Sequence, residues 1–459
     1  MTKQKNLGQI DLLHGPILRS ILLFALPIFI SMLFQQLYNA ADTAIVGNVL
    51  GEESLAAIGS VSSVFDLIIH FATGLCSGFG IVIARAYGSG KKEFLKKAVA
   101  GSLITGLISV AVLTLAGLFG LRPLLSLIHT PAEIFEESYS YIRIISLFLF
   151  VTFLYNLLSG MLRSIGNSVM PLVFLIISSV MNVILDYLFI ARFHAGVRGA
   201  AIATVISQAF SAVLCAIYLF SRVKLLIPEA GHFKVEPRII GELAGQGFAM
   251  AMMSCLVSIS SVILQSGING LGTQIIAAHV AARKIFSLSA LPFVAIPGAV
   301  SVFISQNRGA GQGNRILKAM KDSYLFFAGA AALMTVLLLN LAPALVALIS
   351  GSHNPVILEN GSRYLYVLGP FLFLLGIINV TRSSLQGIGY KLVAVISSLI
   401  ELAGKILFVL LLIPRYGYPA VIFCEPVIWV FMAAELVWAF YTNDYIKGAI
   451  RQSIEGRND

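Results

Sequence analysis

The amino-acid sequence predicts an all-α polytopic membrane protein with twelve transmembrane helices in two six-helix lobes. The composition, the spacing of the apolar runs and an internal repeat carry this prediction. Of 459 residues, 58% are hydrophobic and only 11% are charged, whereas roughly a quarter of an ordinary soluble domain is charged. Lipid is the solvent that suits so much apolar surface. The composition therefore excludes a typical soluble enzyme.

The individual helices follow from apolar runs that polar or turn-forming residues separate. A helix needs about 20 apolar residues to cross a bilayer, and the chain has twelve runs of this kind. They are centred near residues 33, 70, 108, 148, 181, 209, 253, 290, 332, 369, 402 and 432. Residues 17–50 and 55–87 exceed the bilayer thickness, so we expect those helices to tilt, bend or protrude. Pro27 is the predicted bend in the first.

The basic residues indicate the orientation of these helices. The formal net charge is +10, but the chain has no polar domain with the clustered basic face that nucleic-acid binding requires. Most of the 31 Lys and Arg residues lie between apolar runs, on the side that also holds the N-terminus. By the positive-inside rule, both termini are predicted to be cytoplasmic. No nucleic-acid partner is expected.

An internal repeat divides the chain into halves. A shift of 221 residues places segment 84–90 on segment 305–311, and a shift of 223 places 162–166 on 385–389. Each half has an even number of spans, so both halves enter the membrane in the same direction. We therefore expect them to be related by a pseudo-twofold axis along the membrane normal, as in transporters with parallel repeats.

The repeat predicts the domain organisation. The N-terminal lobe is expected over residues 1–221, a cytoplasmic linker over 222–238 and the C-terminal lobe over 239–459. The linker contains Pro228 and Pro237, which are typical of a connection rather than of a span.

The halves differ at polar residues inside the predicted spans, and these are the better functional candidates. Asp42 falls on Ile263, and Asp186 falls on Val409. Asn182 and Asp186 are four residues apart, so they share one face of a helix. A carboxylate inside a bilayer costs a few kcal/mol, so each acid is expected to be protonated, paired or bound to a cation. The two acids form either a site that exchanges H⁺ or Na⁺, or a structural clamp between two helices.

Other ionisable residues inside the spans fit local pairs. Asp66 and His70 are one turn apart and form either a proton relay or a locally satisfied pair. Glu401 and Lys405 have the i, i+4 spacing of an ion pair that neutralises itself, and they would contact a charged substrate if they face the cleft. Two further basic residues, which either attract an anion or line a wet cavity, are Arg283 and Lys284. The sequence carries no motif of a metalloenzyme or of a nucleotide-driven pump.

Three short motifs occur in a distinctive order. They are a first-helix run from Pro27 through Gln35-Gln36 to residues 39–47 (NAADTAIVG), the segment 55–59 (LAAIG), and residues 306–311 (QNRGAG). Together with the two six-helix halves, these motifs resemble the multidrug and toxic compound extrusion (MATE) family of the MOP flippase superfamily. The resemblance covers nearly the whole chain.

The resemblance implies a secondary active antiporter rather than an enzyme. Members export organic, often cationic, compounds by alternating access and take up H⁺ or Na⁺ in exchange. The expected partners are a small organic substrate, the coupling cation and the lipid bilayer, with no other cofactor. The expected location is the cytoplasmic (plasma) membrane, with the protein acting as a monomer. The sequence leaves the substrate and the choice of coupling ion open.

The resemblance also implies where the site lies. The expected cation-coupling residues are Asp42, Asn182, Asp186 and Thr204. The first helix is expected to flex at Pro27. The substrate-cavity residues implied are Gln35, Tyr38, Asn39, Asp66, Tyr155 and Gln208. Positions that are acidic in members with a C-lobe cation site are apolar here, around Val257 and Leu375. Coupling is therefore expected through the N-terminal lobe.

The alternative function is that of a lipid-linked precursor or polysaccharide flippase of the same superfamily. Such a protein requires a basic central cavity for a pyrophosphate group. The residues that could supply one are Arg143, Arg283, Lys284 and Lys405. The acidic pocket of the N-terminal half favours the exporter.

Overall fold

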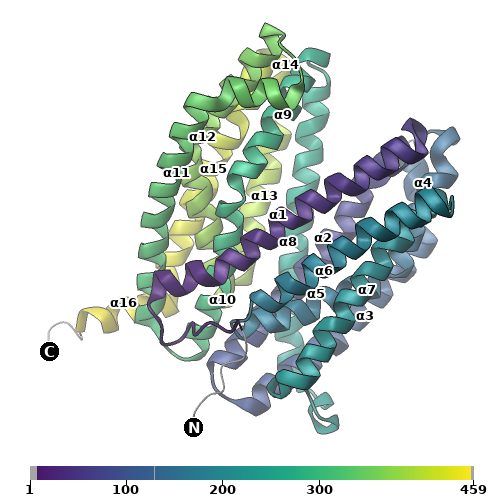
Figure 1. Cartoon of the computed structure of the whole chain (residues 1–459). Coiled ribbons are helices and arrows are strands. Elements are labelled where there is room, and N and C mark those ends of the chain that lie inside the picture. The colour runs from purple at the N-terminus through teal and green to yellow at the C-terminus, as the bar shows by residue number, and fades with distance from the viewer. Residues whose placement is uncertain (1–7, 129, 456–459) are drawn as a thin grey trace. The chain divides into compact units, whose positions relative to one another are not determined.

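The computed structural model describes residues 8–128 and 130–455, and helices dominate this part of the chain (Figure 1). Eleven of its elements are long and apolar enough to cross a membrane. A twelfth span is formed by α4 (Ala132–Leu147) and α5 (Leu149–Ser164), which are bent by 46° relative to one another. The prediction of an all-α protein with twelve spans is confirmed for the described residues.

The first six spans follow the predicted order. Besides the α4–α5 pair they are α1 (Ile17–Leu50), α2 (Glu52–Gly88), α3 (Lys92–Leu127), α6 (Val169–Asp186) with the π-helix η1 (Tyr187–Arg192), and α7 (Gly196–Arg222). Helix α1 continues through Pro27, whose carbonyl oxygen accepts a hydrogen bond from the Ser31 hydroxyl at 2.8 Å. The role of Pro27 as a hinge stays a prediction.

The second six spans repeat this order. They are α8 (Pro237–Asn269), α9 (Thr273–Ala290) with α10 (Pro292–Gly309), α11 (Gly313–Ser350), α12 (Pro355–Gly387), α13 (Lys391–Leu407) with the π-helix η4 (Phe408–Leu412) and α14 (Ile413–Tyr416), and α15 (Tyr418–Thr442). A short helix, α16 (Asp444–Glu455), follows the last span.

The chain folds as two compact units. One comprises Leu26–Ser254 together with the described residues up to Asp11, and the other comprises Leu12–Ala25 together with the residues from Cys255 onward. The division therefore falls inside α1, next to Pro27, and inside α8. The predicted lobe boundaries describe the sequence repeat and stay a prediction.

The backbone preserves the repeat at its turns. Five described glycines of the first half have positive φ angles, a conformation that glycine adopts without the steric cost other residues meet. Four of them have a counterpart in the second half, and the pairs are Gly51 and Gly272, Gly90 and Gly311, Gly166 and Gly389, and Gly196 and Gly417. The π-helices η1 and η4 begin at Tyr187 and Phe408. This alignment places Leu407 opposite Asp186, where the sequence comparison placed Val409. Either residue is apolar, so the acid has no acidic counterpart.

Close helix packing holds the first unit together. Helix α2 packs against α3, α4 and α5, and α7 packs against α4, α5 and α6. At Gly78 a Cβ atom would lie 2.5 Å from the carbonyl oxygen of Gln246 in α8, and at Gly74 it would lie 2.7 Å from Cα of Ala251. These glycines permit the backbones of α2 and α8 to approach, as small residues do between membrane helices.

The predicted linker is a folded segment of the first unit. It contains two short 3-10 helices, η2 (Lys224–Leu226) and η3 (Ala230–Phe233). Ion pairs join it to the start of α3: Glu229 binds Lys96, and Glu236 binds Lys97 at 2.9 Å. Lys96 holds the pKa of the Glu229 carboxyl below its usual range, chiefly by donating a hydrogen bond to it. The linker therefore has a defined conformation.

Candidate functional site

The two predicted coupling acids lie on two spans of the first unit that contribute to one apolar cluster. Asp42 lies on α1, and Asp186 is the last residue of α6, where the backbone passes into the π-helix η1. Such π-turns occur often at functional sites. The surrounding cluster includes Val46, Val61, Ile142, Ile190, Val197 and Ala200. Apolar surroundings strengthen every electrostatic interaction among the polar groups that they enclose.

Asp42 and Asp186 have carboxyl groups that interact directly with one another. Asp186 is fully buried. No donor among the described residues satisfies Oδ1 of Asp42 or either carboxyl oxygen of Asp186. Two ionised carboxylates are acceptors only, so a hydrogen bond between them needs a shared proton. Nine tenths or more of buried polar groups in proteins have a partner, so these three oxygens are exceptions among the described residues.

The other two predicted coupling residues lie on α6 and α7. Asn182 is buried one turn before Asp186, and no acceptor among the described residues satisfies its Nδ2. Thr204 on α7 donates its hydroxyl hydrogen to the carbonyl oxygen of Ala200 at 3.0 Å. Its hydroxyl oxygen therefore remains an acceptor or a ligand, not a donor to the acids. The coupling role of all four residues stays a prediction.

The structure adds Tyr141 to this site, a residue that the sequence did not single out. It lies on α4, is almost fully buried, and its hydroxyl is within electrostatic range of Asp42, Asp186, Tyr38 and Asp66. The ring of Phe65 packs against it, with centroids 6.3 Å apart. A phenol hydroxyl can donate to a carboxylate. Tyr141 is therefore a buried polar neighbour of the acid pair.

The predicted substrate-cavity residues have different surroundings. Those on α1 and α2 that are at least partly exposed are Gln35, Asn39 and Asp66, and Asp66 interacts with His70 one turn away. Tyr38 is half-buried and interacts with both Tyr155 and Asp42. Tyr155 itself packs in the core of the first unit, and Gln208 accepts a hydrogen bond from Thr152. Their contact with substrate stays a prediction.

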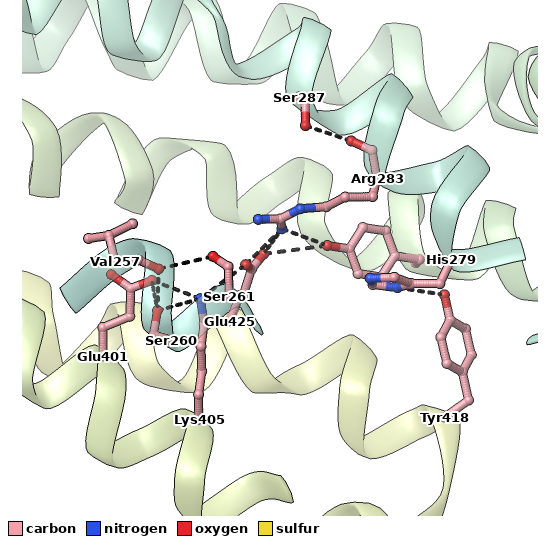
Figure 2. Close-up of polar contacts among 11 residues, drawn as sticks. Val257, Ser260, Ser261, His279, Arg283, Ser287, Glu401, Lys405, Tyr418 and Glu425 are labelled. Carbon is pink, nitrogen blue, oxygen red and sulfur yellow. Dashed lines mark hydrogen bonds and ion pairs between the residues drawn. The ribbon is translucent and has the colours of Figure 1, made fainter. Parts of the chain in front are cut away.

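The second unit holds a different polar cluster, which Figure 2 shows in close-up. The Glu425 carboxylate on α15 accepts two hydrogen bonds from Nη1 of Arg283 on α9, at 2.7 and 2.8 Å. On α13, Nζ of Lys405 lies 2.8 Å from Oε1 of Glu401 and 3.9 Å from Oε1 of Glu425. Ser260 on α8 accepts a hydrogen bond from Lys405 at 3.2 Å. We call these five residues the charge network.

The charge network is balanced, and all of its charged members except Arg283 are largely buried. Its two cations face two carboxylates, and the side chains of Lys405 and Glu425 are 2% and 6% exposed. Buried charges persist only when they are paired and hydrogen-bonded. The predicted pair of Glu401 and Lys405 is confirmed. The pairing of Arg283 with Glu425 could not be predicted, because 142 residues separate them.

Twelve spans built as a twofold repeat, with polar groups buried inside each half, define a polytopic membrane transporter. The profile of the MatE family matches residues 27–188 and 249–411, once in each half. The chain belongs to the MatE family, the multidrug and toxic compound extrusion transporters.

Several relatives resemble the chain over most of its length. It is 30% identical to the "Probable multidrug resistance protein YoeA" of Bacillus subtilis over 311 residues, which are 66% of this chain and 67% of that one. It is 28% identical to the "FAD transporter" of Shewanella oneidensis over 386 residues, which are 82% and 83% of the two chains. A solved structure of a multidrug resistance MATE family transporter in an outward-facing conformation matches 98% of this chain and 100% of its own, with a TM-score of 0.87 and 24% identity, which establishes the fold.

Proposed function

We propose that the protein is an antiporter that exports small organic, often cationic, compounds in exchange for H⁺ or Na⁺, and that Asp42 and Asp186 bind the coupling ion. One observation carries the proposal. Two neighbouring carboxyl groups inside membrane spans leave three oxygens without a donor among the described residues. A proton or a sodium ion would satisfy these oxygens, and each binds carboxylates readily.

Coupling follows if the pair holds its cation more tightly in one conformation than in the other. A ligand shifts a conformational equilibrium only by its difference in affinity for the two states. Substrate and coupling ion then influence one another reciprocally. On this proposal, loading the acid pair favours the state that releases substrate outside. All residues of the proposed site belong to one chain, so a monomer suffices for coupled transport. On this proposal the protein lies in the cytoplasmic membrane with both termini in the cytoplasm.

The charge network argues against the flippase alternative. A pyrophosphate group needs a cavity of net positive charge, whereas Arg283 and Lys405 each pair with a carboxylate. The guanidinium of Arg143 lies 5.9 Å from the ring centroid of Tyr139, on a different unit. These surroundings support an exporter.

Transport in liposomes tests the proposal. The purified protein is reconstituted, and transport of a fluorescent organic cation is followed under a pH gradient alone and under a Na⁺ gradient alone. We expect one gradient to accelerate transport, and we expect Asp42→Asn and Asp186→Asn to lose that acceleration by at least about tenfold. Asp322→Asn, an acid on α11 that belongs to neither polar cluster, is the matched control. The proposal is contradicted if neither gradient changes the transport rate, or if both variants keep the acceleration by the gradient.

A further inference from the structure

Arg283 is the member of the charge network that is open on one side. Its Nη1 donates to both oxygens of Glu425 and to the Tyr364 hydroxyl, the last at 3.2 Å. Its Nε and Nη2 have no partner among the described residues, and its side chain is 38% exposed. Figure 2 shows the guanidinium with one end joined to Glu425 and the other end without a contact.

An open guanidinium edge inside a membrane span does not face hydrocarbon. Charged groups within spans face the protein interior or a water-filled space, because exposure of a cation to lipid is costly. Arg283 lies in the candidate span Thr273–Gly309. We therefore expect the Nε and Nη2 donors to face water or a ligand rather than lipid.

The geometry of that edge selects the chemistry of the ligand. The two hydrogens on Nε and Nη2 are parallel and match the two oxygens of a carboxylate or a phosphate. We propose that Arg283 is a binding site for an oxyanion group of the transported compound, held by the Nε and Nη2 edge while Glu425 and Tyr364 hold Nη1. The site then selects compounds that carry a carboxylate or a phosphate.

The surroundings hold the guanidinium in one orientation. The Tyr364 hydroxyl donates to Oε2 of Glu425 at 3.4 Å, and the Tyr364 ring meets the His279 ring edge-on at 5.0 Å. The guanidinium carbon lies 5.9 Å from the centroid of Phe286, and Phe286 stacks on Trp429. A guanidinium that is already oriented loses less entropy when it binds an anion.

The remaining charges determine how tightly an anion binds. Glu425 neutralises Arg283 and so opposes a second negative charge nearby. Lys405 reduces this opposition, because its ammonium lies 3.9 Å from Oε1 of Glu425 and offers that carboxylate a second cation. Glu401 lies 2.8 Å from the Lys405 ammonium and partly neutralises it, so Lys405 offsets the repulsion between Glu425 and an anion only in part. The network therefore permits moderate anion binding and is sensitive to the charge on Glu425.

Glu425→Gln distinguishes an anion site from a purely structural network. Gln retains an acceptor for Nη1 but removes the negative charge. If Arg283 binds an anion, the variant binds anions more tightly. If the network has only a structural role in joining α9, α13 and α15, Arg283→Gln and Glu425→Gln should change anion binding in the same direction.

The test measures equilibrium binding to the purified full chain with two matched ligand pairs. One pair is a rhodamine dye with a free benzoate group and the ethyl ester of the same dye. The other pair is flavin mononucleotide and riboflavin, which differ by a phosphate. Binding is measured without an ion gradient, so the result does not depend on the ion coupling in the proposed function. The inference rests on the proposed function only in assuming that an organic compound enters the protein.

We expect Arg283→Gln to weaken binding of the anionic member of at least one pair by about tenfold or more, and to change binding of its neutralised partner by less than about twofold. We expect Glu425→Gln to tighten the same anionic ligand severalfold. A response confined to one pair identifies the group as a carboxylate or as a phosphate. The matched control is Arg415→Gln, an exposed arginine of the same unit, with wild-type binding.

The double variant Arg283→Gln/Glu425→Gln keeps the network neutral. It replaces Arg283→Gln in the binding test if that single variant does not fold. It should bind both members of each pair alike. Equal effects of Arg283→Gln on both members, no effect on either, or weaker anion binding in Glu425→Gln would each overturn the proposal.

Discussion

Lys405 and Glu401 lie one helical turn apart on α13 and form an ion pair of 2.8 Å whose lysine side chain is 2% exposed. Burial makes each partner dependent on the other. Breaking a buried pair on one side costs about 3–5 kcal/mol, because the remaining charge is left without compensation.

Lys405→Met should therefore lower the stability of the protein by about 3 kcal/mol. The double variant Glu401→Gln/Lys405→Met removes both charges and should recover most of this loss. Thermal unfolding of the purified protein in one detergent measures the difference. A double variant no more stable than Lys405→Met would show that the two charges are not coupled.

Gly78→Ala should destabilise the contact between α2 and α8. The added Cβ would lie 2.5 Å from a backbone carbonyl oxygen, which cannot move as a side-chain end can. We expect a loss of about 1–3 kcal/mol, as for other overpacked sites. Gly59→Ala on the same helix is the matched control, since no atom lies within 4 Å of its Cβ position. Equal melting temperatures for the two variants would contradict the close approach.

Tyr141→Phe should impair ion coupling without unfolding the protein. The variant removes a hydroxyl near Asp42 and Asp186 but keeps the ring that packs in the apolar cluster. We expect gradient-driven transport to fall severalfold and its pH profile to shift, while the melting temperature stays within a few degrees. Tyr139→Phe, on the same helix, should transport normally. An unchanged pH profile in Tyr141→Phe would remove the residue from the site.

Acidification should release the linker from α3. The pKa of Glu229 is lowered from its usual 4.5 by the hydrogen bond from Lys96. The pair therefore stabilises the folded linker fully above about pH 4.5 and loses this effect as the pH falls through the lower, folded-state pKa. Hydrogen exchange of η3, corrected for its intrinsic pH dependence, should rise in that range. Glu229→Gln should exchange at neutral pH as the wild type does in acid, and protection that survives both changes would exclude the ion pair as its cause.

Local patterns predicted most of the fold. Hydropathy predicts a span from about 20 consecutive residues, and the repeat follows from comparison of the chain with itself, so the twelve spans could be predicted. The pair of Glu401 and Lys405 could be predicted for the same reason, since its spacing is that of one turn. The packing of the linker against α3 depends on distant contacts and could not.

The candidate site divides along the same line. Asp42, Asn182 and Asp186 were found because charged or amide groups are rare in spans and break the repeat. Tyr141 carries no such signal, because a tyrosine in an apolar helix usually belongs to the core. The partnership of Arg283 with Glu425 depends on how α9 and α15 pack, and no spacing in the sequence reports it.

The paired glycines show that the two halves share the backbone conformation of their turns, although they carry different charged residues. On the proposed function, this difference bears on the voltage dependence of transport. The balanced network adds no net charge, and an acid pair that binds the coupling ions carries at most two protons per cycle. Exchange of one proton for a monovalent cation would be electroneutral, whereas exchange of two would draw current across the membrane.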